Sequence, residues 1–150
     1  MDNKNSPILH VDGSLTEYLD QDGILYQVAG IGGYLVVDGK IVKRFNRCLT
    51  NEPFLNHHEE YAVLEGMKWV KAAGYNTLKI KTDSMYSISL FNNKKKDIAR
   101  VDQYFLTQYL ALNYAFENVE IQYHQRAIDD LAHLMSRVYL NKIPKNVILL

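Results

Sequence analysis

The dipeptide Asp38-Gly39 constrains the fold of this chain more than any other feature, because it separates two apolar runs at residues 30–37 and 41–49. Both residues of an Asp-Gly pair accept the positive φ angles of a type I′ turn, and the pair is the strongest short-range signal of a β-hairpin. The sequence therefore predicts two antiparallel strands joined at this dipeptide.

The hydrophobic pattern changes from a period of two to a helical period after this hairpin. Apolar side chains recur at steps of three and four residues from Ala62 to Val70, and Gly74 is a typical helix end. Leu78 and Ile80 then alternate with polar residues, which indicates a strand. The pattern further predicts a short helix from Ser84 to about Leu90, a long helix from Asp97 to Phe116, a strand over 119–123 and a helix from about Arg126 to Leu140.

A short apolar run over residues 8–11 precedes the hairpin and ends at Asp12-Gly13-Ser14, whose residue types favour a turn. The polar stretch at 16–27 is expected to be a loop or a widened hairpin connection. The order of elements is then β-β-β-α-β-α-α-β-α. This order predicts an α/β fold in which helices flank a five-stranded mixed sheet.

Composition excludes several classes of protein. The chain has 150 residues, 17 Lys and Arg against 17 Asp and Glu, and 47% hydrophobic residues, so intrinsic disorder is not expected. The length predicts one domain over residues 1–150, with a core at about 6–140 and a C-terminal tail at 141–150. The single Cys48 excludes a disulfide framework. The absence of a long apolar run and the polar start at residues 1–7 predict a cytoplasmic protein with no membrane segment.

Four acidic residues stand where they could meet in one cleft. Asp12 and Asp83 follow apolar strands, and Glu59 and Asp129 stand near the starts of helices. Each has a structural explanation as a turn residue or as a favourable charge at a helix N-terminus. Together, however, crowded carboxylates repel one another unless a cation neutralises them. Carboxylate oxygens are the ligands of Mg²⁺, and two such ions can promote phosphodiester hydrolysis.

The segments that carry these residues resemble the motifs of ribonuclease H type 1. Val11-Asp12-Gly13-Ser14 resembles the opening motif of that family, and Asn56-His57-His58-Glu59 resembles its Asn-x-x-Glu segment. Thr82-Asp83-Ser84 resembles its Thr-Asp-Ser, and Asp129-Asp130-Leu131-Ala132 resembles its closing Asp-x-Leu-Ala. The spacing of these motifs selects Glu59 over Glu60 and Asp129 over Asp130. The resemblance covers about residues 6 to 140 and implies the ribonuclease H-like fold.

The resemblance implies a metal-dependent endonuclease that cleaves the RNA strand of RNA/DNA hybrids. Two Mg²⁺ ions, with Mn²⁺ as a substitute, would be held by four catalytic and metal-binding carboxylates. Asp12 would bridge both ions, Asp129 would lie nearer the attacking water, and Glu59 and Asp83 would hold the ion nearer the leaving oxygen. The implied substrate-binding residues are Gly13, Ser14, Asn56, Ser84, Lys94, Lys95 and Lys96.

Two features depart from the family, and a pair of histidines suggests another metal. The loop before Asp129 is short, so His124 either stands in for a mobile general acid or merely ends its strand; the strand end is favoured. The stretch at 16–27 is acidic, which does not suit a phosphate backbone. His57 and His58 suggest zinc, but no further His or Cys follows at ligand spacing.

These departures leave two other functions open. One is a catalytically weak or inactive relative that binds nucleic acid or a protein partner. The other is the same metal chemistry on a different nucleic acid. A monomer is favoured, although the sequence does not fix the oligomeric state or the role of the apolar tail.

Overall fold

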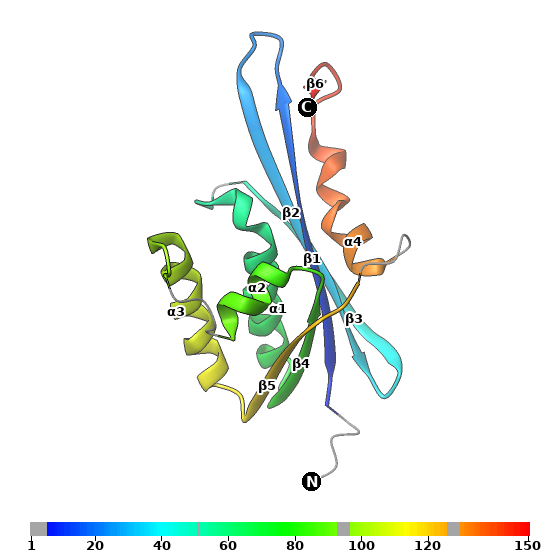
Figure 1. Cartoon of the computed structure of the whole chain (residues 1–150). Coiled ribbons are helices and arrows are strands. Elements are labelled where there is room, and N and C mark those ends of the chain that lie inside the picture. The colour runs from blue at the N-terminus through cyan, green and yellow to red at the C-terminus, as the bar shows by residue number, and fades with distance from the viewer. Residues whose placement is uncertain (1–5, 51, 93–96, 126–129) are drawn as a thin grey trace.

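The computed structural model describes residues 6–50, 52–92, 97–125 and 130–150. Its sheet has the strand order β3-β2-β1-β4-β5 (Figure 1). The first three strands form an antiparallel meander, and the last two extend it in parallel on the other side of the first strand. This arrangement confirms the predicted mixed sheet. The strands are β1 (Ile8–Leu19), β2 (Leu25–Val37), β3 (Lys40–Leu49), β4 (Thr77–Thr82) and β5 (Asn118–Tyr123).

Helices cover both faces of the sheet. One face carries α1 (His58–Ala72), α2 (Met85–Phe91) and α3 (Arg100–Tyr114), while α4 (Leu131–Ser136) lies on the other (Figure 1). A 3-10 turn over Leu55–His57 leads into α1. In the described part of the chain, no helix has the length and apolar character needed to cross a membrane.

The core lies between the sheet and the helix layer of α1 and α3. Side chains of β1 and β4 alternate between this core and the opposite face, so Leu9 and Ile80 are fully buried. They pack with Met67 of α1 and Phe105 of α3, which are also fully buried. The predicted hairpin at Asp38-Gly39 is confirmed, with φ angles of 53° and 78°.

The prediction that the first strand ends at Asp12 was wrong, and of the two alternatives for 16–27 the structure has the hairpin and not the loop. The pairing of β1 with β2 continues without a break from Ile8↔Val36 to Leu19↔Leu25. The turn lies farther along, where the Asp20 carboxylate accepts hydrogen bonds from the Asp22 and Ile24 amides. The backbone ladder therefore outweighs the turn preference of Asp12 and Gly13. Residues 15–28 form a hairpin, here called the arm, which projects beyond the helices (Figure 1).

The last helix is much shorter than predicted. Asp130 has extended backbone angles and its carboxylate accepts a hydrogen bond from the Ala132 amide, so α4 begins only at Leu131. The helix ends at Ser136, and a separate 3-10 segment follows at Val138–Lys142. The predicted start near Arg126 lies outside the described residues.

One other helix boundary differs from the prediction, and the structure also places the C-terminal tail. The long helix α3 begins at Arg100 rather than at Asp97, because Ala99 before it is extended. The tail that the sequence left unplaced contributes a strand, β6 (Ile148–Leu149), which pairs with the far end of β1 at Leu19 and Tyr18.

Candidate active site

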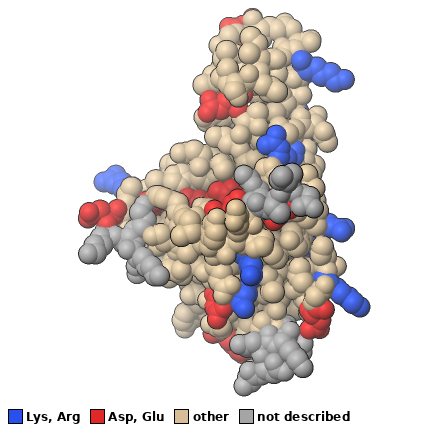
Figure 2. Space-filling model, turned by 45° about the vertical axis from the view of Figure 1, so that its right-hand side comes forward, with Lys and Arg blue, Asp and Glu red and all other residues tan. Residues whose placement is uncertain are grey.

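Three carboxylates from separate elements meet at the carboxyl end of β4. Asp12 lies within β1, Glu59 in the first turn of α1, and Asp83 directly after β4. One oxygen from each carboxylate lies within 4.8 Å of the others. Figure 2 shows acidic side chains gathered near the middle of the visible face, between the body and the base of the arm. The sequence alone named these three residues.

Strand register brings two of these carboxylates together. β1 and β4 are parallel neighbours, and His10 is opposite Lys81. Two residues further along each chain are Asp12 and Asp83, so the register places them side by side.

A glycine brings the third carboxylate close. A Cβ atom on Gly13 would lie 2.7 Å from the carbonyl oxygen of His58, so the start of α1 can approach β1 only at a glycine. The Gly13 amide then donates to Asp12 Oδ1 at 3.0 Å and to Glu59 Oε1 at 2.8 Å.

Glu59 is the most perturbed acid of the cluster. Burial raises its pKa to about 10, assisted by the charge of Asp12, a hydrogen bond with Asp12 and the charge of Asp83, while the Gly13 amide opposes the shift. Its Oε2 atom is buried and has no hydrogen-bond partner among the described residues. A buried acceptor beside two other carboxylates fits a divalent cation, which takes oxygen ligands and would favour the ionised form of Glu59.

Asp12 is the most buried of the three, at 3% exposure. The Nδ1 atom of His133 in α4 lies 3.0 Å from Asp12 Oδ2. The cluster is therefore contacted by α4 on one face of the sheet and contains Glu59 of α1 from the other face. The helix α4 reaches β2 because Gly32 is opposite Asp12, and a Cβ on Gly32 would lie 2.5 Å from the backbone of Met135. The sequence reasoning did not identify His133, whose only signal was its position shortly after Asp129.

A hydrogen-bonded network joins the elements that carry Glu59 and Asp83. Glu60 is 4% exposed, lies 3.0 Å from His57 Nδ1, and accepts a hydrogen bond from Ser87 Oγ of α2 at 3.1 Å. Ser84 caps α2 by accepting from the Ser87 amide, as the sequence predicted for a helix start there. Glu60 therefore points away from the carboxylate cluster and links α1 to α2, while His57 belongs to this network.

A small cavity next to the cluster holds further polar groups. Asp12, Asp83, Lys81, His124 and Asp130 line it, together with His10. The ring of His10 stacks on Tyr34, and burial, followed by the charge of His124, lowers the pKa of His10 to about 4. His10 is two residues from Asp12 and so shares its face of the sheet, and the alternation of β1 was the signal that could have found it.

His124 follows the end of β5, and its amide donates to the carbonyl of Thr82 at 2.8 Å. Its Nε2 atom lies 3.8 Å from Asp130 Oδ2, and its ring contacts His10 edge-on. It thus follows the end of its strand, which is the alternative that the sequence favours, and it also lines the cavity.

The remaining predicted site residues are spread around the cluster. Asn56 is exposed on the 3-10 turn before Glu59. Ser14 is buried and donates to the carbonyl of Ser136 in α4 at 3.0 Å, so its hydroxyl contacts protein. The predicted ligand Asp129 and the predicted substrate contacts Lys94, Lys95 and Lys96 lie outside the described residues.

The fold and the acidic cluster together define a ribonuclease H-like protein. Residues 29–138 match the family described as "Reverse transcriptase-like", and the chain therefore belongs to that family. The match includes Glu59, Asp83 and Asp129 and begins after Asp12. A search of curated proteins found no match.

Solved structures share the fold at low sequence identity. RNase H1 from the halophilic archaeon Halobacterium salinarum is 17% identical, with a TM-score of 0.76 over 92% of this chain and 99% of that one. LC11-RNase H1, solved in complex with an RNA/DNA hybrid, is 13% identical, with a TM-score of 0.75 over 91% and 98%. A foamy viral protease-reverse transcriptase in complex with an RNA/DNA hybrid is 15% identical, with a TM-score of 0.65 over 93% of this chain and 20% of that one.

Proposed function

We propose that this protein is a divalent-metal-dependent endonuclease that hydrolyses the RNA strand of RNA/DNA hybrids. The observation that carries the proposal is the cluster of Asp12, Glu59 and Asp83, in which a buried Glu59 oxygen has no hydrogen-bond partner among the described residues. Mutual repulsion and burial destabilise such a cluster unless it binds a cation. A ribonuclease H-like fold with this cluster supports phosphodiester hydrolysis above other metal chemistry.

The chain's own groups would hold and orient the cations. Asp12, Glu59 and Asp83 would be ligands, and Asp129 is proposed as the fourth on the strength of its sequence motif. Mg²⁺ or Mn²⁺ would supply a more acidic bound water and would neutralise charge that develops on the phosphate. The Gly13 amide fixes one oxygen of Glu59 and one of Asp12, and His133 fixes the other oxygen of Asp12.

The choice of an RNA/DNA hybrid as substrate rests on resemblance and on exposed polar groups. Two structures of similar fold were solved with RNA/DNA hybrids. Asn56 is exposed three residues before Glu59, where a side-chain amide could contact a 2′-hydroxyl, the group that distinguishes RNA from DNA. A cytoplasmic location remains part of this proposal.

The test is cleavage of a hybrid with labelled RNA, in Mg²⁺ and then in Mn²⁺. We expect cleavage by the wild type, none by Asp83→Asn, and intact single-stranded RNA, double-stranded RNA and double-stranded DNA. Asp38→Asn is the matched control, because it removes the same charge from an exposed turn. Equal cleavage by Asp83→Asn, or cleavage of single-stranded RNA alone, would refute the proposal.

A second candidate is a module that binds nucleic acid without cleaving it. It is favoured by the contact of His133 with Asp12 Oδ2, which in this candidate withholds that oxygen from a second cation, so that His133→Ala would strengthen Mn²⁺ binding. This candidate predicts that the folded wild type binds the hybrid in either metal but leaves the RNA intact.

A further inference from the structure

The arm is a feature that the proposed catalytic site does not use. Its two strands, together with β6, form a three-stranded antiparallel sheet in which β6 pairs with Tyr18 and Leu19 of β1. The Leu150 amide also donates to the carbonyl of Glu17 at 3.0 Å. At its base the arm is held by a hydrogen bond between Thr16 and Tyr139 at 2.6 Å.

This small sheet has no hydrophobic core of its own. No side chain from residue 15 to residue 28 is buried, and residues 21–27 are all exposed. Antiparallel sheets of this size need a covered apolar face to be stable in water. The largest exposed apolar side chains of the arm and tail are Ile24, Leu25, Tyr26, Ile148, Leu149 and Leu150, each between 42% and 69% exposed.

One edge of the arm is open for pairing. β3 pairs with β2 only as far as Ala29, whereas β2 begins at Leu25. Residues 25–28 therefore have no strand beside them on that side within the described part of the chain. An open edge with exposed apolar side chains is a template for an added strand.

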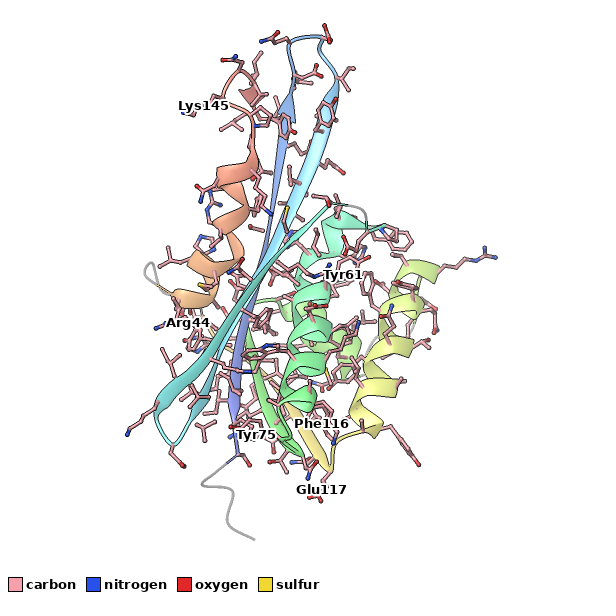
Figure 3. All side chains as sticks on the ribbon, turned by 180° about the vertical axis from the view of Figure 1, so that it is seen from behind. Arg44, Tyr61, Tyr75, Phe116, Glu117 and Lys145 are labelled. Carbon is pink, nitrogen blue, oxygen red and sulfur yellow. The ribbon has the colours of Figure 1, made fainter. Side chains whose placement is uncertain are left out.

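A hollow of about 520 Å³ lies between the arm and the tail. The rings of Tyr18 and Tyr26, stacked with centroids 5.2 Å apart, line it together with Asp20 and Asp22. Lys145 also lines it from the tail and lies beside the arm in Figure 3. Aromatic faces next to carboxylates are the surroundings that bind a guanidinium or an ammonium group.

Charge decides between candidate occupants of this surface. Residues 15–28 contain three acidic side chains, Glu17, Asp20 and Asp22, and no basic one. A phosphate backbone would be repelled. Two copies joined edge to edge through β2 would place two arms of the same charge side by side, which is also unfavourable. A positively charged partner is the one that this surface attracts.

We propose that the arm docks an extended segment of a partner protein, rich in basic and apolar residues, that adds as a strand along residues 25–28. The apolar side chains of the segment cover Ile24 and Leu25, and one of its Lys or Arg side chains enters the hollow over Tyr18 and Tyr26. Backbone pairing supplies affinity, and the acidic hollow supplies selectivity for basic segments.

The test is a selection from a displayed library of random dodecapeptides against the full chain. The counter-selection uses the arm variant, Ile24→Lys with Leu25→Lys, which removes the apolar contacts and reduces the net charge of residues 15–28 from −3 to −1. The matched control is Ile41→Lys with Val42→Lys, in β3 beside the other end of β2. The exposures of the two pairs agree, at 51% and 52% for the first and 46% and 47% for the second.

We expect the enriched peptides to alternate Lys or Arg with apolar residues. A labelled synthetic peptide should bind the wild type and the control variant alike and the arm variant about tenfold more weakly, because an apolar anchor is lost and a like charge is added. Hydrogen exchange at residues 25–28 should slow when the peptide binds.

Three outcomes would overturn the proposal. The first is that the enriched peptides are acidic, or that they bind the arm variant as tightly as the wild type. The second is that no peptide is enriched over the counter-selection. The third is that the wild type forms a dimer in sedimentation and only the arm variant loses it. The last outcome would assign the surface to a second copy of the chain. Circular dichroism melts of both variants verify folding, which these exposed positions should leave intact.

Discussion

Replacing Glu59 by Gln tests whether the acidic cluster is built for a cation. In the metal-free protein the pKa of Glu59 is raised from 4.5 to about 10, chiefly by burial and then by the charge of Asp12. At neutral pH the folded protein therefore keeps a proton that the unfolded chain releases. Stability from this group is complete below pH 4.5 and is lost progressively as the pH rises toward 10.

The size of the effect follows from the same values. Each pH unit between the two pKa values costs about 1.4 kcal/mol, so moving from about pH 5 to about pH 8 would cost at most about 4 kcal/mol. The side chain of Glu59 is 18% exposed, and its titration is coupled to the charge of Asp12. Both factors reduce the loss of unfolding free energy between the two pH values to about 1–3 kcal/mol. The Glu59→Gln variant avoids the penalty and can retain the hydrogen bond from Gly13. Its melting temperature in EDTA should exceed that of the wild type by about 3–10 °C at about pH 8 and by much less at about pH 5.

The assay is thermal unfolding by circular dichroism at both pH values, with EDTA and then with Mn²⁺. Mn²⁺ should raise the melting temperature of the wild type and have little effect on Glu59→Gln. Asp38→Asn should follow the wild type throughout, because its carboxylate lies in the hairpin turn, away from the cluster. A Glu59→Gln variant that is no more stable than the wild type at the higher pH, or equally more stable at both pH values, would refute the electrostatic reasoning.

Three further predictions follow from the surroundings of the cluster. Glu60→Ala should lower the free energy of unfolding in urea by about 2–4 kcal/mol, because it leaves His57 without its buried partner; no change would contradict the network. Gly32→Ala should cost about 1–3 kcal/mol by forcing α4 away from β2, and a melting temperature equal to that of the wild type would show that the two elements do not pack this closely. His133→Ala should weaken Mn²⁺ binding in calorimetry by about 10–100-fold, because Asp12 loses the group that orients it, and unchanged affinity would remove that role.

Local sequence patterns were sufficient to predict most of the sheet, and the resemblance of motifs to a known family named the three acids that cluster. The hairpin at Asp38-Gly39 and the alternation of β4 depend on side chains and backbone angles within a few residues, so they could be predicted. Asp12, Glu59 and Asp83 could be named because their motifs occur in the order of a family whose fold the chain shares. The convergence of these residues was an inference from strand ends, although Asp12 lies inside its strand.

The predictions that failed, or could not be made, concern segments whose structure depends on backbone pairing and not on local residue preference. Residues 16–27 resemble a loop when read alone, yet β2 pairs with the whole of β1 and extends both strands into the arm. The tail could not be assigned from the sequence, because its strand β6 pairs with β1 at Tyr18, more than a hundred residues earlier in the chain. Such pairing energies cannot be read from the local segment that gains them.

The sequence by itself determined the order of the elements, the acids available for a metal and the negative charge of the arm. Only the tertiary structure decided how those groups act. It buried Glu59 beside Asp12, turned Glu60 away toward Ser87, and placed His133 against the same Asp12 carboxylate. The physical reason is that pKa values and ligand geometry depend on distance and desolvation, which arise only when segments far apart in the chain pack together.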